Sequence, residues 1–127
     1  MKIELNLSID ERLITPEVKD FIKQAQKCIE LYAKKNADYG NSFAEGMDLL
    51  GPIYGVGGIH DKHSRFIELH KPDKISQVED ETIDDTVRDM ACYSMMFLAY
   101  REEKKETENL VACCKAKVAN QNRSEKI

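Results

Sequence analysis

The densest group of acidic residues in the sequence ends at Asp89 and includes Glu81 and Asp85. On a helix these three side chains form one column, and like charges at this spacing repel each other by roughly a few tenths of a kcal/mol per pair. A cation, a basic side chain, or water together with the helix dipole must offset this repulsion. Asp89 adjoins apolar residues, so we expect it to be half-buried and to need a partner. Two interpretations stay open: a divalent metal ion, or a salt bridge to Lys62 or Arg65.

A second group of charged residues follows Gly57-Gly58 and contains Asp61, Lys62 and Arg65. A glycine-rich segment that leads into a basic helix is typical of an anion site, because the amides at a helix N-terminus can bind an anion. The glycine pair alone is a weak signal, since the sequence has no GxxxxGK[ST] motif. It also has no GxSxG motif, so the pattern gives no support to a serine nucleophile.

A third group of residues lies where the first predicted helix ends. Lysines there complement the helix C-terminus, and Gly40 can take the left-handed conformation that closes a helix. The remaining side chains are polar or aromatic and are suited to gripping a base and its sugar: Asp38, Tyr39, Ser42 and Phe43.

Hydrophobic periodicity predicts helices around these groups. Thr15-Pro16-Glu17 predicts a helix start, and apolar residues at three- and four-residue intervals continue the helix to about residue 36. All 6 glycines fall between Gly40 and Gly58, which predicts a long connection with one short helical turn near 43–50. The other predicted elements are a helix over about 58–70, a third helix from about 79, a charged run over 101–108 that either continues or breaks it, and an amphipathic piece over 110–118.

Residues 2–9 alternate strictly between apolar and polar side chains, which is the period of a β-strand. The sequence therefore predicts a mainly α fold, a small helical bundle with one short N-terminal strand. We expect a single domain over residues 1–119 and a polar tail over 120–127.

The composition narrows the function classes. The chain has 127 residues and a net charge of −4, so it offers no basic field for a nucleic acid duplex. It contains neither an apolar run that could span a membrane nor a secretory signal. Its 4 cysteines include no CxxC pair, which favours free thiols in a reducing compartment and hence a cytoplasmic protein.

Three motifs together, KKNADYGNSF, GGIHDKHSRFIEL and ETIDDTVRDMACYSMM, resemble the nucleotide modification associated domain 1 family of phages and bacteria. That family is in turn similar to the all-α nucleoside triphosphate pyrophosphatases of the MazG and dimeric dUTPase type, which are helical oligomers. The resemblance implies Mg²⁺ held by Asp61, Asp85 and Asp89, and phosphates contacted by Lys62 and Arg65. The residues implied to line the nucleoside end are Lys35, Asp38, Tyr39, Gly40, Ser42 and Phe43.

The sequence departs from those pyrophosphatases on the earlier acidic helix. They carry an EExxE cluster there, whereas this chain has Asp61-Lys62-His63-Ser64-Arg65. One acid with two cations favours a single metal ion or direct contact between the basic side chains and the phosphates. Two functions are expected: a Mg²⁺-dependent nucleotide pyrophosphohydrolase, or a non-catalytic protein that sequesters or senses a nucleotide. The resemblance also implies a homo-oligomer in a bacterial or phage-infected cell.

Overall fold

The computed structural model describes residues 1–72 and 82–124. Within these residues the chain is mainly helical and has no strand, which confirms the predicted all-α class. The helices are α1 (Pro16–Tyr39), α2 (Ser42–Leu50), α3 (Pro52–Leu69) and α4 (Ile83–Ser124), preceded by a short 3₁₀ turn at Glu11–Leu13. The sequence predicted one domain over residues 1–119. The contacts divide the chain into two compact units, Met1–Gly40 and Asn41–Ile127.

The first unit contains α1, and its ends follow the sequence signals. The Thr15 hydroxyl oxygen accepts a hydrogen bond from the Val18 amide at 3.3 Å, and Pro16 is the first helical residue. At the other end Gly40 has a φ of 63° and donates its amide to the Asn36 carbonyl at 2.8 Å. This left-handed residue favours glycine, and it closes the helix three residues beyond the predicted end.

Residues 2–9 also belong to the first unit, and the predicted strand is wrong. These residues have no regular secondary structure, and each of them is exposed. A strand forms when its backbone groups pair with a neighbouring strand, and no described residue belongs to a strand. The alternation alone therefore does not make residues 2–9 a β element.

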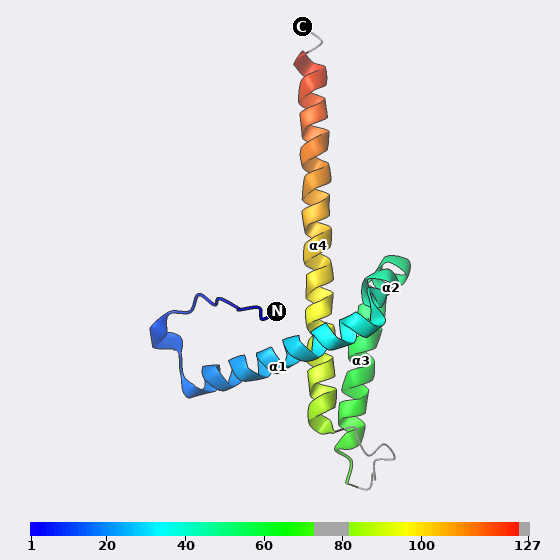
Figure 1. Ribbon diagram of the computed structural model, residues 1–127. Helices are drawn as coiled ribbons and strands as arrows, with labels where there is room; N and C mark the ends of the chain where they lie inside the picture. Colours follow the sequence, from blue (N-terminus) through cyan, green and yellow to red (C-terminus); the bar gives the residue numbers. More distant parts are fainter. Residues whose placement is uncertain (73–81, 125–127) are drawn as a thin grey trace. The chain divides into compact units, whose positions relative to one another are not determined.

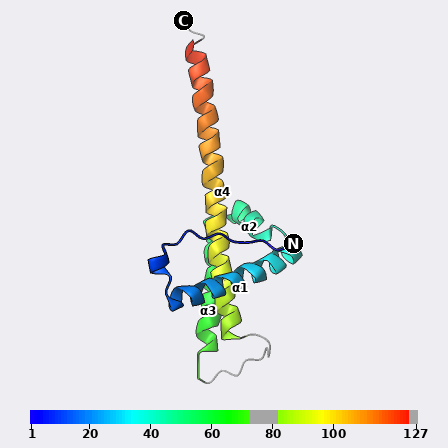
Figure 2. The same ribbon diagram turned by 60° about the vertical axis from the view of Figure 1, so that its left-hand side comes forward.

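The second unit contains α2, α3 and α4, and α3 runs alongside the first part of α4 in both views (Figures 1 and 2). The predicted long connection over 40–58 is wrong, because most of it is helical and α3 begins at Pro52. The glycines of α3 make room for large rings of α4. A Cβ at Gly55 would overlap the ring of Phe97, and a Cβ at Gly58 would lie 3.0 Å from the ring of Tyr93. Residue numbers rise along α3 as they fall along α4, so the two helices are antiparallel.

Helix α4 settles two expectations about the end of the chain. The charged run over 101–108 continues the helix, and the predicted polar tail is helical as far as Ser124. Every residue from Arg101 to Ser124 is exposed. No helix in the described parts of the chain has the length and apolar character that a membrane span requires.

Candidate functional site

The centre of the candidate site is an ion pair between α3 and α4. The Lys62 ammonium lies 3.3 Å from the Asp89 carboxylate, and the two side chains are 30% and 19% exposed. The Lys62 ammonium also lies 5.9 Å from the centre of the Tyr93 ring. The prediction that Asp89 is half-buried and partnered is thus confirmed, and Lys62 forms a salt bridge with it. Arg65 is half-buried on α3, three residues after Lys62.

Because α3 begins at Pro52, the basic residues of the predicted anion site do not lie at a helix N-terminus. Lys62 and Arg65 lie in the interior of α3, with Lys62 roughly three turns from its first residue. The free amides of the helix N-terminus are therefore too far away to bind the same anion as these side chains. Any anion bound here would be held by the basic side chains themselves.

Aromatic rings from all three helices of the second unit meet beside Lys62. The ring of Phe43 on α2 lies 5.8 Å from that of Tyr54 on α3 and 6.1 Å from that of Tyr93 on α4. The separations and tilts are those of favourable aromatic pairs. One cation and an aromatic cluster thus lie together within this unit.

Asp85 takes part in the start of α4. The Thr82 hydroxyl accepts from the Asp85 amide at 3.1 Å, and the Asp85 carboxylate accepts from the Thr82 amide at 3.4 Å. This reciprocal arrangement is a capping box, which satisfies amides that the helix leaves without partners. Asp85 also lies 3.6 Å from the Arg88 guanidinium. Glu81, the first member of the predicted acidic column, lies outside the described residues.

Asp61 differs from the other two carboxylates that the sequence assigned to a metal. Its side chain is 86% exposed and lies 4.0 Å from a ring nitrogen of His60. Among the residues that the structure describes, no group of three His, Cys, Asp or Glu side chains could hold a metal ion. The residues therefore do not fit a Mg²⁺ ion shared by Asp61, Asp85 and Asp89 as they are arranged here.

The residues predicted to line the nucleoside end are divided between the two units. Lys35 and Asp38 are exposed in the last turns of α1, which ends at Tyr39 and is closed by Gly40. The others open α2 in the second unit: Ser42 is exposed, and Phe43 is half-buried in the aromatic cluster. Of the predicted substrate-binding residues, four lie in the same unit as Asp89: Ser42, Phe43, Lys62 and Arg65.

A further polar cluster links α2 to α4 and was not found from the sequence. The Tyr100 hydroxyl donates a hydrogen bond to the Asp48 carboxylate at 2.6 Å, and the Lys104 ammonium lies 3.1 Å from the same oxygen. These contacts, that of Tyr100 first, lower the pKa of Asp48. The Asp48 carboxylate in turn raises the pKa values of Tyr100 and Lys104. Tyr100 and Lys104 are one helical turn apart, but nothing in the sequence pairs them with Asp48, 52 residues earlier.

Comparison with known proteins finds no matching family model, no similar curated protein and no similar solved structure. The fold and the site define a mainly helical protein whose second unit holds a lysine–aspartate pair beside an aromatic cluster. The motif resemblance to nucleotide-processing proteins is a hypothesis to be tested at this site.

Proposed function

We propose that the protein binds a nucleotide and retains it without hydrolysis. Lys62 and Arg65 contact the phosphates, and the base packs near Phe43 and Tyr93. The observation that carries the proposal is the Lys62–Asp89 pair, 3.3 Å apart and next to the Tyr93 ring. A partly shielded cation next to aromatic faces is the combination that recognises an anionic ligand with a planar base.

The carboxylates support binding over hydrolysis. Asp89 pairs with Lys62, Asp85 caps α4, and Asp61 is strongly exposed. The contacts of Asp89 and Asp85 compete with metal binding, because a carboxylate oxygen that faces a cation or an amide has to leave it to coordinate Mg²⁺. In the proposed complex the phosphates compete with Asp89 for Lys62, and no metal ion is required.

The second candidate function is the Mg²⁺-dependent nucleotide pyrophosphohydrolase. The observation that favours it is the position of Asp85 and Asp89, one turn apart on α4 and both at the end of the helix that meets α3. Under this hypothesis Asp85 and Asp89 would hold the metal ion, and Lys62 would contact the phosphates. The metal ion would polarise the phosphoryl group and activate water.

The experiment is a mass-spectrometric incubation with a panel of nucleoside and deoxynucleoside triphosphates, in Mg²⁺ and in EDTA. Under the binding proposal an intact nucleotide is retained in EDTA, and Asp89→Asn tightens its binding by up to about tenfold, because a competing negative charge is removed. Lys62→Met loses the nucleotide. Asp84→Asn is the matched control, since it removes the same charge from an exposed neighbouring position on α4.

The two functions give opposite results for Asp89→Asn. A pyrophosphohydrolase converts a triphosphate to its monophosphate in Mg²⁺ alone, and this variant abolishes the conversion. If the wild-type protein neither retains nor cleaves any nucleotide of the panel, both functions are refuted. A bacterial or phage-infected cytoplasm as the site of action belongs to the same proposal.

A further inference from the structure

Helix α4 carries one heptad seam along most of its length, and the second unit covers only the first part of it. The seam is polar at Lys104 and Thr107 and becomes apolar again from Val111 to Val118. Residues at alternating intervals of three and four, the a and d positions of a heptad, run from Thr86 to Gln121. In the first part of this seam, Tyr93 and Phe97 lie against glycines of α3, and Tyr100 bonds to Asp48 of α2. Beyond Lys104 the same seam continues on a helix whose residues are all exposed.

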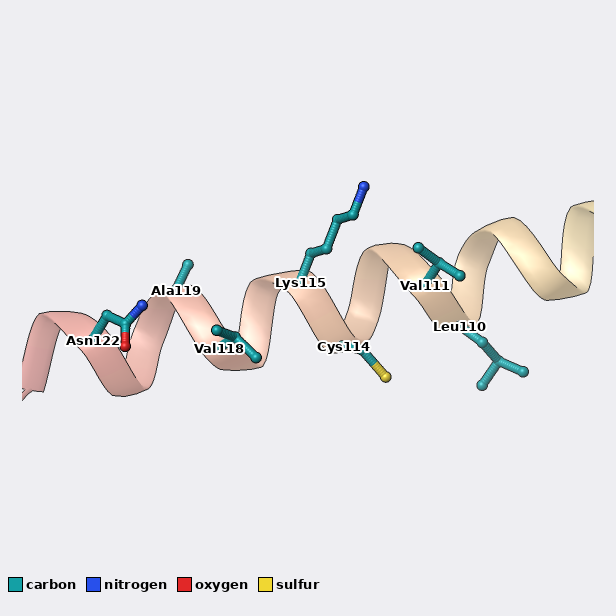
Figure 3. Close-up of a pocket in the computed structure, with 7 residues that line it drawn as sticks. All are labelled: Leu110, Val111, Cys114, Lys115, Val118, Ala119 and Asn122. Carbon is teal, nitrogen blue, oxygen red and sulfur yellow. The ribbon is translucent and has the colours of Figure 1, made fainter.

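The exposed part of the seam is apolar at its centre. Leu110, Val111 and Val118 are 67%, 48% and 55% exposed, and Cys114 lies between them as a free thiol. Figure 3 shows Leu110, Cys114 and Val118 in one row along the helix, with Val111 and Lys115 in the neighbouring row. An unpartnered helix of this kind gains most of its stability when an apolar face is covered.

We propose that this face, defined by Leu110, Val111, Cys114 and Val118, pairs with the same face of a second copy of the chain, with the two helices antiparallel. In that arrangement the residues at the a positions of one copy lie opposite the residues at the d positions of the other. Val111 lies opposite Cys114, and Thr107 lies opposite Val118, each pair occurring twice about the two-fold axis. The proposal is independent of nucleotide binding, because none of these residues belongs to the candidate site.

The charges that flank the seam select the second copy and the antiparallel direction. Glu108 and Lys115 occupy equivalent e positions on either side of the apolar centre. In an antiparallel pair e faces e, so Glu108 of each copy meets Lys115 of the other. In a parallel pair the g positions of one copy face the e positions of the other. Glu103, at a g position, would then lie next to Glu108 of the other copy, and the like charges would repel. The helix is therefore complementary to itself in one direction only.

Disulfide trapping tests the direction. Thr107→Cys and Val118→Cys are introduced together with Cys113→Ser and Cys114→Ala. The new thiols are eleven residues apart, about 16 Å along the helix, too far for a bond within one copy. Mild oxidation is expected to give a dimer in which peptide mapping finds residue 107 linked to residue 118. The variants that carry only one of the two new cysteines are the matched controls and stay monomeric on a reducing-agent-free gel, with the buried Cys28 and Cys92 present in all of them. Links of 107 to 107 and 118 to 118 would establish a parallel pair and overturn the proposal.

A charge exchange gives an independent readout by light scattering and sedimentation over a series of protein concentrations. The expected result is that the wild-type chain dimerises, that Glu108→Lys and Lys115→Glu each shift dimerisation to higher concentration, and that the double variant restores it. A parallel pair predicts the opposite sign for Glu108→Lys, since it replaces a Glu103–Glu108 repulsion with an attraction. Circular dichroism at each step reports whether α4 is intact. A wild-type chain that is helical and monomeric at every concentration, or whose association ignores both exchanges, refutes the pairing.

Discussion

The close approach of α3 to α4 at Gly55 gives a quantitative prediction. A Cβ at Gly55 would overlap the Phe97 ring and lie 3.1 Å from the Met47 sulfur, and both Gly55 and Met47 are buried. At Gly57, in the same helix, an added Cβ would have no described heavy atom within 4 Å. Alanine in place of glycine inside a helix contributes about 1 kcal/mol of helix propensity at either position. Overpacking a filled interface costs about 1–3 kcal/mol, and only Gly55 bears that cost.

We therefore expect Gly57→Ala to raise the free energy of unfolding by about 1 kcal/mol, and Gly55→Ala to lower it by up to about 2 kcal/mol. Urea unfolding followed by the helical circular dichroism signal measures both. In the Gly55→Ala background, Phe97→Leu is expected to cost less than it does in the wild type, because it removes part of the overlapping ring. Equal stabilisation by the two alanine variants would refute the packing of Gly55 against Phe97.

Three other predictions concern the contacts of Asp48 and the start of α4. Tyr100 and Lys104 lower the pKa of Asp48, so its carboxylate stabilises the fold above the pKa it has when unfolded, and this stability is lost as the pH falls through the folded pKa. The difference in melting temperature between wild type and Asp48→Asn should therefore shrink as the pH falls below the unfolded pKa of about 4, and vanish once the pH is below the folded pKa. The raised pKa values of Tyr100 and Lys104 give stability that is lost as the pH rises through their folded values, and Tyr100→Phe should flatten that alkaline loss. At the start of α4, Thr82→Ala should lower the free energy of unfolding by about 1 kcal/mol, while Thr82→Ser, which keeps the hydroxyl that bonds to Asp85, should have little effect. A urea titration that finds the two Thr82 variants equal would contradict the capping box.

The start and end of α1 could be predicted because their causes are local. Thr15 and Pro16 act on amides within one turn, and the conformation of Gly40 depends on its own backbone. The end of the helix was placed three residues early because an apolar periodicity fades before the hydrogen bonding does. Local signals of this kind need no knowledge of the rest of the fold.

The glycine-rich segment could not be interpreted correctly from composition. Glycine lowers helix propensity by about 1 kcal/mol per residue, so several glycines together indicate a loop. In this chain Gly55 and Gly58 lie within a helix, and the packing of Phe97 and Tyr93 against them offsets that cost. Those rings belong to a helix more than thirty residues further along the chain, so the local sequence around the glycines does not indicate that the rings pack there.

The contact between Asp89 and Lys62 is likewise a long-range contact that the local sequence could not identify. The sequence indicated that this carboxylate needs a cation, and it left Lys62, Arg65 and a metal ion as candidates. The Lys62 ammonium lies 3.3 Å from the Asp89 carboxylate, and the antiparallel register of α3 and α4 brings the two side chains together. The glycine–ring contacts one and two turns away set this register, so the contact between Lys62 and Asp89 is a property of the helix pair.

The spacing of Asp85 and Asp89 has two physical explanations that a sequence cannot separate. Carboxylates four residues apart can share a metal ion, and the same spacing places one at the start of a helix and the other one turn further in. In the described structure the first accepts from the Thr82 amide and the second faces Lys62. A Mg²⁺ ion that recruited both would have to offset a cap worth about 1 kcal/mol and leave the Lys62 ammonium to find another anion. A nucleotide phosphate would supply that anion, so we expect any Mg²⁺ dependence to appear only when the nucleotide is present.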